Sequence, residues 1–153
     1  MKNQKALVIA GFPGIGKSVY ADKIKIDSSK IVLDFDPRIF DRENYPQNYI
    51  DAINEVKNKV SMIFIGSNKV LLKALKEADI DFVVVYPDKS LKEEYLKKYK
   101  ERGDSKMFIN MMDKEWDEMI DYIEDSGYKI VRLMKKDYYL EDILNIIPKI
   151  FPL

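Results

Sequence analysis

Short runs of apolar residues alternate along the chain with longer segments that are apolar on one side only. Several of the short runs are nearly continuous in Val, Ile, Leu and Phe, which is typical of parallel strands covered on both faces. We expect five strands: Ala6–Ala10, Ile31–Phe35, Val60–Ile65, Phe82–Tyr86 and Ile130–Met134.

The longer segments repeat their apolar residues at three- and four-residue spacing, which predicts helices. They are Lys17–Ile26, Tyr49–Asn58, Asn68–Ala78, Leu91–Lys100, Met107–Asp125 and Leu140–Ile147. In Met107–Asp125, the methionine-rich stripe is interpreted as core and the acidic face as solvated. The regular alternation predicts an α/β fold, one domain over residues 1–153 with a five-stranded parallel sheet and helices on both faces.

The amino-acid composition narrows the kinds of catalytic and binding site that the protein can contain. The 153 residues contain no cysteine and no histidine, so thiolate zinc sites, Cys nucleophiles and Ser-His-Asp triads are excluded. Lys plus Arg equals Asp plus Glu at 26 each, so there is no overall charge to gather nucleic acid, which remains a possible but not a favoured partner. No apolar run reaches the length of a membrane span. We therefore expect a cytoplasmic protein with no membrane partner.

The first predicted strand leads into GFPGIGKS, which satisfies the phosphate-loop pattern G-x-x-x-x-G-K-[ST]. Glycines let successive backbone N–H groups surround an anion, and the helix that follows presents its positive end. Lys17 adds a charge for the β- and γ-phosphates, and Ser18 offers a hydroxyl to Mg²⁺. The pattern predicts ATP or GTP with Mg²⁺ as cofactors. The expected nucleotide contacts are Gly11, Phe12, Pro13, Gly14, Ile15, Gly16, Lys17, Ser18 and Val19.

The second strand ends in LDFDPR, where Asp34 and Asp36 are two residues apart and so point to the same side of an extended chain. Beside a phosphate loop, such carboxylates can hold Mg²⁺ and accept the proton of an attacking hydroxyl. We assign Asp34 with Ser18 to the metal and Asp36 to the base, although the two carboxylates can exchange roles. The chain lacks the N-K-x-D motif of switch GTPases and the acidic third strand of motor ATPases.

With GFPGIGKS, LDFD and a basic helical segment past the fourth strand, the sequence resembles the small P-loop kinases, the nucleoside-monophosphate and shikimate or gluconate kinase group. It also looks like the short nucleotide kinases of bacterial viruses and prophages. The resemblance implies a three-layer P-loop NTPase fold. It further implies an acceptor-binding segment over about residues 37–58 and a lid over about residues 89–106.

Carried over from that group, Lys17, Asp36 and Arg102 are the expected catalytic residues, with Arg102 closing over the transferred phosphoryl group. The expected acceptor contacts are Asp34, Asp36, Arg38, Tyr49 and Asn68. The third strand is followed by Gly66-Ser67-Asn68, where the family places an arginine. This departure leaves open whether the acceptor carries a phosphate or a plain hydroxyl.

These observations predict an ATP- and Mg²⁺-dependent kinase acting on a small, nucleotide-like acceptor. Two alternatives remain open at this point. One is a nucleotide-binding regulatory or interaction module with little transfer activity, and the other is a kinase acting on polynucleotides or hydroxymethylated DNA bases. The sequence does not determine the oligomeric state.

Overall fold

A computed structural model describes residues 4–17, 20, 32–35, 42–144 and 147 of the chain. Five parallel strands form one sheet in the order β2-β3-β1-β4-β5. They are β1 (Leu7–Gly11), β2 (Val32–Asp34), β3 (Met62–Ile65), β4 (Val83–Pro87) and β5 (Lys129–Leu133). The sheet therefore confirms the five strands and the parallel arrangement predicted from the apolar runs.

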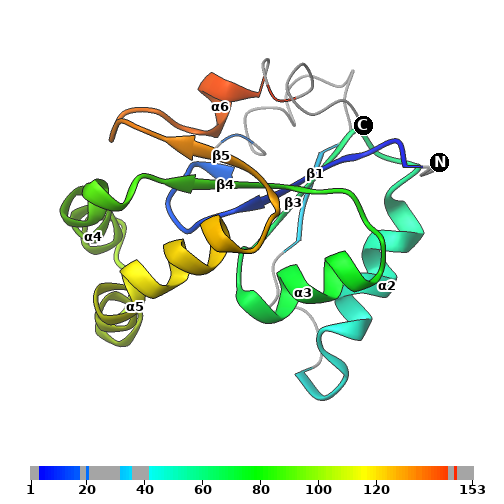
Figure 1. Cartoon of the computed structure of the whole chain (residues 1–153), viewed down its shortest axis with the longest axis horizontal. Coiled ribbons are helices and arrows are strands. Elements are labelled where there is room, and N and C mark those ends of the chain that lie inside the picture. Colours follow the sequence, from blue (N-terminus) through cyan, green and yellow to red (C-terminus); the bar gives the residue numbers. More distant parts are fainter. Residues whose placement is uncertain (1–3, 18–19, 21–31, 36–41, 145–146, 148–153) are drawn as a thin grey trace.

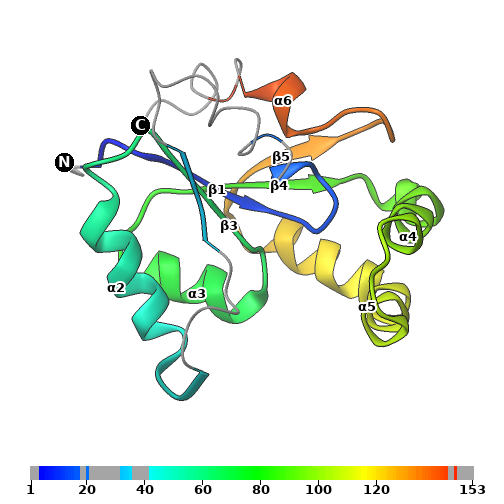
Figure 2. The ribbon, with the colours of Figure 1, turned by 180° about the vertical axis from the view of Figure 1, so that it is seen from behind.

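Helices follow the strands along the chain, and those between two strands make the crossover that a parallel arrangement requires. They are α2 (Gln47–Val56), α3 (Lys69–Glu77), α4 (Lys92–Glu101), α5 (Lys106–Asp125) and α6 (Leu140–Ile143), with 3-10 turns η2 (Arg42–Asn44) and η3 (Lys89–Leu91). In both views α2, α3 and α5 cover one face of the sheet and α6 lies on the opposite face (Figures 1 and 2). The expected helix over Lys17–Ile26 falls mostly outside the described residues.

Capping side chains fix where two of these helices begin. Asn68 accepts a hydrogen bond from the Leu71 amide at 2.9 Å and starts α3, and Ser105 accepts one from the Phe108 amide at 3.1 Å and starts α5. Each cap satisfies an amide that has no partner inside its helix. Of the two, α3 starts directly after β3, and α5 starts directly after α4.

The core lies between the sheet and its helices. The inner strands are almost entirely buried, because β3 and β4 are covered on both faces. Trp116 of α5 is fully buried, and its indole nitrogen donates to the carbonyl of Lys89 at 2.9 Å. Of the helices in the described part of the chain, none has the length and apolar character to cross a bilayer.

Candidate functional site

The glycine loop follows β1 directly, at the carboxyl edge of the sheet. Gly14 and Gly16 have φ values of +91° and +96°, in the region that side chains with a Cβ rarely adopt. A Cβ on Gly14 would also lie 3.1 Å from the ring of Tyr99. Both positions therefore favour glycine because of their backbone conformation, as the glycine-rich sequence pattern predicted.

Carbonyl groups of the loop are held from its outer side. The Gly14 carbonyl accepts from Lys98 Nζ at 3.2 Å, and the Pro13 carbonyl accepts from the Tyr99 hydroxyl at 2.7 Å. The Ile15 carbonyl accepts from the Leu140 amide at 2.9 Å. Contacts from α4 and α6 thus turn successive carbonyls away from the centre of the loop, an orientation that suits anion binding by its amides.

Aromatic packing ties the same loop to α5. The ring of Phe12 meets Trp116 edge to face, with centroids 5.2 Å apart and an interplanar angle of 83°. Tyr95 packs against Trp116 in turn, with centroids 5.7 Å apart. Because all three side chains are buried, the loop and α5 share one hydrophobic contact and are held at a fixed separation.

Lys17 lies at the centre of the loop. Its Nζ donates to the Gly11 carbonyl at 2.5 Å and approaches the Ile65 carbonyl at 3.4 Å, so it spans the ends of β1 and β3. Burial lowers the pKa of Lys17 to about 8, with an opposing contribution from Asp34 and a smaller lowering from Arg102. An ammonium that is poorly solvated in this way gains strongly from a bound polyphosphate.

Asp34 ends β2, in register with Phe64 of the neighbouring β3. Its side chain is exposed, and its negative charge opposes the lowering of the Lys17 pKa. Among the residues that the structure describes, no group of three metal-ligating side chains occurs. Mg²⁺ needs no such group beside a nucleotide, since one or two carboxylates and the phosphates suffice. Asp34 fits that requirement.

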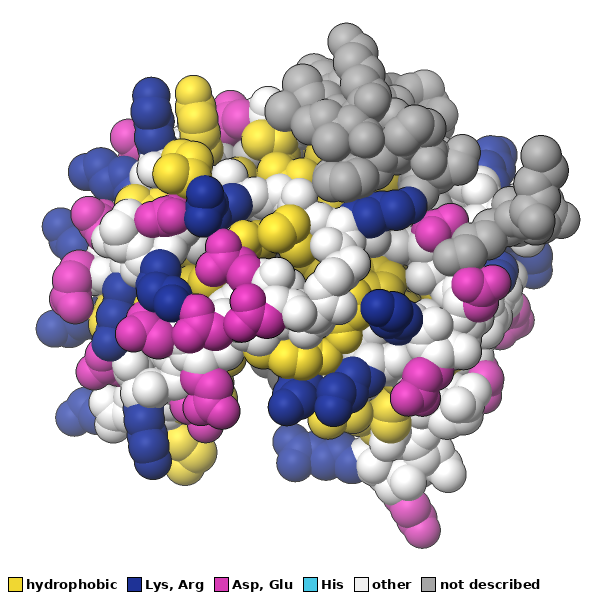
Figure 3. All heavy atoms as spheres, in the orientation of Figure 1, with side chains coloured by type: hydrophobic (Ala, Val, Ile, Leu, Met, Phe, Trp, Pro, Cys, Tyr) yellow, Lys and Arg dark blue, Asp and Glu magenta, His cyan; other side chains and the backbone are white. Residues whose placement is uncertain are grey.

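A cavity of about 790 Å³ opens beside Lys17. In the part of the chain that the structure describes, its walls are the glycine loop, the junction between β3 and α3, and one side of α5. Figure 3 shows the hollow on this face of the molecule, between α5 and α3. The lining residues are Gly11, Pro13, Lys17, Gly66, Ser67, Asn68, Lys69, Phe108, Met111, Met112, Glu115, Glu118, Met119, Asp121, Tyr122 and Asp125.

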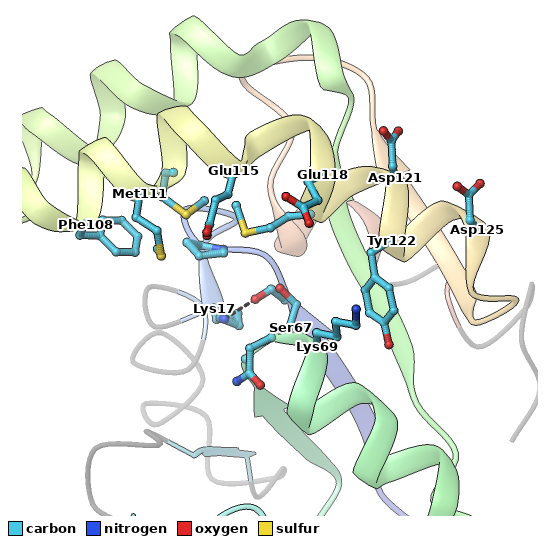
Figure 4. A pocket seen from close by; sticks show the side chains of 16 residues that line it. Lys17, Ser67, Lys69, Phe108, Met111, Glu115, Glu118, Asp121, Tyr122 and Asp125 are labelled. Carbon is cyan, nitrogen blue, oxygen red and sulfur yellow. Dashed lines mark hydrogen bonds between the residues drawn. The ribbon is translucent and has the colours of Figure 1, made fainter.

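Side chains of α5 supply most of this lining. In Figure 4, Phe108 and Met111 point from α5 toward the loop side of the cavity, and Glu115 and Glu118 reach into the space above Lys17. Asp121 and Asp125 point away from it (Figure 4). Since Lys17 belongs to both the loop and the cavity, a group bound in the cavity lies next to the candidate phosphate site.

The structure places the predicted acceptor residues unequally. Asn68 lines the cavity, and its amide also donates to the Tyr45 hydroxyl at 3.0 Å. Tyr49 is instead fully buried, and its hydroxyl donates to the Phe35 carbonyl at 2.7 Å. In this structure Tyr49 is therefore packed inside the protein and is not among the described residues that line the cavity, so its role as an acceptor contact stays a prediction. Ser18, Val19, Asp36 and Arg38 lie outside the described residues.

Arg102, the expected lid arginine, pairs with Asp104 and lies over the ring of Tyr99 at 5.0 Å. It follows α4 directly and precedes Gly103, whose φ is +84°. Of the cations predicted for this segment, Lys98 contacts the loop, and its Nζ lies between the rings of Tyr95 and Tyr139 at 4.1 and 4.5 Å. In the structure, the predicted lid segment is packed against the loop.

Sequence reasoning missed the part that α5 takes in the site. Met112 is core, as interpreted, but Met111 is 39% exposed and lines the cavity. The acidic face is largely exposed, as interpreted, and two of its carboxylates form surface ion pairs, Asp113 with Lys92 at 2.8 Å and Asp121 with Lys89 at 2.5 Å. The sequence did carry a signal for this role. At helical spacing, Glu115 and Glu118 fall beside the methionine stripe and away from the acidic face of the helix.

No family model matches the chain, and no curated protein matches it. Solved structures do resemble it. The YorR protein from Bacillus subtilis, in complex with phosphorylated GDP, has a TM-score of 0.59 at 13% identity, over 93% of this chain and 95% of that chain. A gluconokinase from Sinorhizobium meliloti 1021 has a TM-score of 0.55 at 13% identity, over 98% of this chain and 95% of that chain. The chain shares the α/β fold of these two structures, and its first strand ends in the glycine loop of a P-loop NTPase fold.

Proposed function

We propose that the protein is a phosphotransferase that moves the γ-phosphoryl group of ATP or GTP to a hydroxyl of a small acceptor. One observation carries the proposal: Lys17 belongs both to the glycine loop and to the wall of a cavity of about 790 Å³. A donor on the loop and an acceptor in the cavity would then meet at this lysine. The similarity in fold to a gluconokinase and to a structure with phosphorylated GDP supports the same reading.

In the proposed reaction, the acceptor oxygen attacks the γ-phosphorus and the bond to the β–γ bridging oxygen breaks. The nucleoside diphosphate leaves with that electron pair, and the hydroxyl proton passes to a carboxylate at the end of β2. Asp36 is the proposed base and Asp34 its neighbour. Lys17 and the loop amides hold the β- and γ-phosphates, which orients the donor in line with the acceptor.

Mg²⁺ would be held by the Ser18 hydroxyl and, through water, by Asp34. When bound, the ion neutralises charge on the β- and γ-phosphates. Arg102 is the proposed cation that completes this neutralisation from the lid segment. Its charge contributes, as the smallest of three causes, to the shift in the pKa of Lys17, which supports this role.

The finer proposal is a nucleotide-like acceptor, either a nucleoside monophosphate or a nucleoside or other hydroxyl compound, and a direct screen tests which of these it is. Protein and γ-labelled ATP or GTP are incubated with nucleosides, nucleoside monophosphates, sugars and hydroxymethylated DNA, and labelled products are separated. A labelled small molecule that requires Lys17 supports the proposal. Saturable nucleotide binding without transfer to any acceptor contradicts it and favours a binding module, and labelled DNA favours the polynucleotide alternative.

A further inference from the structure

The cavity has an apolar floor and an acidic rim. Phe108 and Met119 are partly buried against the core and Met112 is fully packed, so this side of α5 offers an apolar surface next to Lys17. Glu115 and Glu118 stand three residues apart on the same helix and reach over that surface (Figure 4). A bound molecule would touch apolar atoms and carboxylates together.

These two glutamates differ from three other acidic residues of α5. Asp113, Asp121 and Glu124 each pair with a cation, at 2.8, 2.5 and 3.2 Å respectively. Within the described part of the chain, no such cation lies in contact with Glu115 or Glu118. Glu115 and Glu118 therefore reach into the cavity as carboxylates with no neutralising cation among the described residues.

The described lining of the cavity contains two cations, Lys17 and Lys69, and each already contacts other groups of the protein. Lys17 is held at the ends of β1 and β3, where the donor phosphates are proposed to bind. Lys69 lies over the ring of Tyr122 at 5.0 Å, at the other end of the cavity. No arginine is among the described lining residues. An acidic acceptor would therefore face Glu115 and Glu118 at short range without a matched cation from this wall.

We propose that the acceptor is a hydroxyl compound with an apolar body and a positively charged or hydrogen-bond-donating group that binds Glu115 and Glu118, and that it is not an acid such as a nucleoside monophosphate or a sugar acid. This inference rests on the proposed function, since it names the substrate class of the same cavity. The apolar floor takes the body of the molecule, the carboxylates take its donors, and the reacting hydroxyl lies at Lys17.

Three probes that share a phenyl ring and carry a positive, a neutral and a negative polar group test the inference: benzylamine, benzyl alcohol and benzoate. Each is titrated into the full chain, loaded with a non-hydrolysable ATP analogue and Mg²⁺, with methionine methyl groups labelled with ¹³C. The methyl signals of Met111, Met112 and Met119 report on the cavity, and those of Met107 and Met134 report on exposed surface elsewhere.

We expect benzylamine to shift the cavity methyl signals first, benzyl alcohol next and benzoate last, with benzylamine binding about tenfold more tightly than benzoate. In Glu115→Gln/Glu118→Gln this preference should shrink to about twofold or less. The control Glu94→Gln removes an exposed carboxylate of α4 that does not line the cavity and should leave the preference unchanged. Equal binding of benzoate, or no shift of the cavity signals by any probe, overturns the inference.

The same samples separate this inference from the proposed function. If the ATP analogue fails to bind while the order of the three probes holds, the proposed phosphotransferase function fails and the charge preference of the cavity stands. If the analogue binds at the loop but benzoate binds best, the function stands and the inference about the acceptor fails.

Discussion

The two walls of the cavity are built in different ways. On the loop side, the wall is built from backbone groups. Lys98, Tyr99 and the Leu140 amide donate hydrogen bonds to carbonyls of the loop, and glycines allow its backbone conformation. On the α5 side, the wall consists of side chains of an amphipathic helix, including methionines and glutamates that line the cavity. The loop wall suits one kind of ligand, a polyphosphate, whereas the helix wall can change its ligand with a few substitutions.

The loop wall should depend most strongly on Lys17. We expect Lys17→Met to weaken nucleotide binding and to lower transfer by about 100-fold or more, since an essential phosphate cation is lost. Isothermal titration calorimetry with ATP and Mg²⁺ measures the binding. The control Lys97→Met, at an exposed position of α4, should bind normally. Undiminished binding by Lys17→Met would remove the loop from the account.

The pH dependence of binding gives a second test of the same residue. Because the pKa of Lys17 is about 8 in the free protein, the ammonium loses its proton above that pH, and bound phosphates should hold the proton on. We expect nucleotide affinity to fall by up to about tenfold for each pH unit above 8, with proton uptake on binding. Titrations at pH 7, 8 and 9 in two buffers measure both. A flat profile contradicts the assignment.

Stability should respond with the opposite sign. The pKa of Lys17 is lowered from 10.5 in the unfolded chain to about 8, so the unfolded state binds more protons between these values. This residue's contribution to the free energy of unfolding therefore rises with pH across that window. Lys17→Met should be at least as stable as the unaltered protein at pH 7, and that advantage should disappear by about pH 10.

The path of the loop can be broken at a glycine. Gly14→Ala places a Cβ at a φ of +91° and 3.1 Å from Tyr99, so we expect a loss of about 1–3 kcal/mol in the free energy of unfolding and weaker nucleotide binding. Urea unfolding measures the first. Gly127→Ala is the matched control, with a φ of +77° but no atom within 4 Å. Equal losses in both variants would mean that crowding against α4 contributes nothing.

A smaller effect tests how α4 holds the loop. Tyr99→Phe removes the hydroxyl that donates to the Pro13 carbonyl, and we expect a loss of about 1 kcal/mol in the free energy of unfolding. Tyr95→Phe is the control, because the buried Tyr95 hydroxyl has no hydrogen-bond partner in the described structure. That variant should be neutral or slightly stabilising. If Tyr95→Phe costs more than Tyr99→Phe, the assigned contacts are wrong.

The contrast between the loop wall and the α5 wall also explains how much of the structure could be predicted from the sequence. The sheet and the loop follow from local signals, namely apolar runs and a glycine pattern whose backbone requirement is strict. The cavity depends on how α5 is rotated against the loop, which Phe12 and Trp116 determine across more than a hundred residues of chain. A methionine stripe predicts burial equally well in a core or a cavity, so Met111 carried no distinguishing signal.

Tyr49 illustrates the same limit of prediction from sequence, since it was expected to contact an acceptor and is buried in the structure. Its position after the second strand suggested an acceptor contact, but a tyrosine can also bury its ring and donate its hydroxyl to a carbonyl, as it does toward Phe35. Asn68 combines both possibilities, because it caps α3 and lines the cavity. Sequence position alone does not separate these outcomes.

The central claim is that donor and acceptor meet where the cavity adjoins Lys17, and filling the cavity tests it most directly. Met111→Trp is compared with Met107→Trp, which lies on the same helix, is 83% exposed and does not line the cavity. The measurement is kcat/KM for the acceptor that the screen identifies, together with the Kd for ATP. We predict that Met111→Trp lowers kcat/KM by about tenfold or more at an unchanged Kd, and that Met107→Trp changes neither. Equal transfer by both variants would contradict the account.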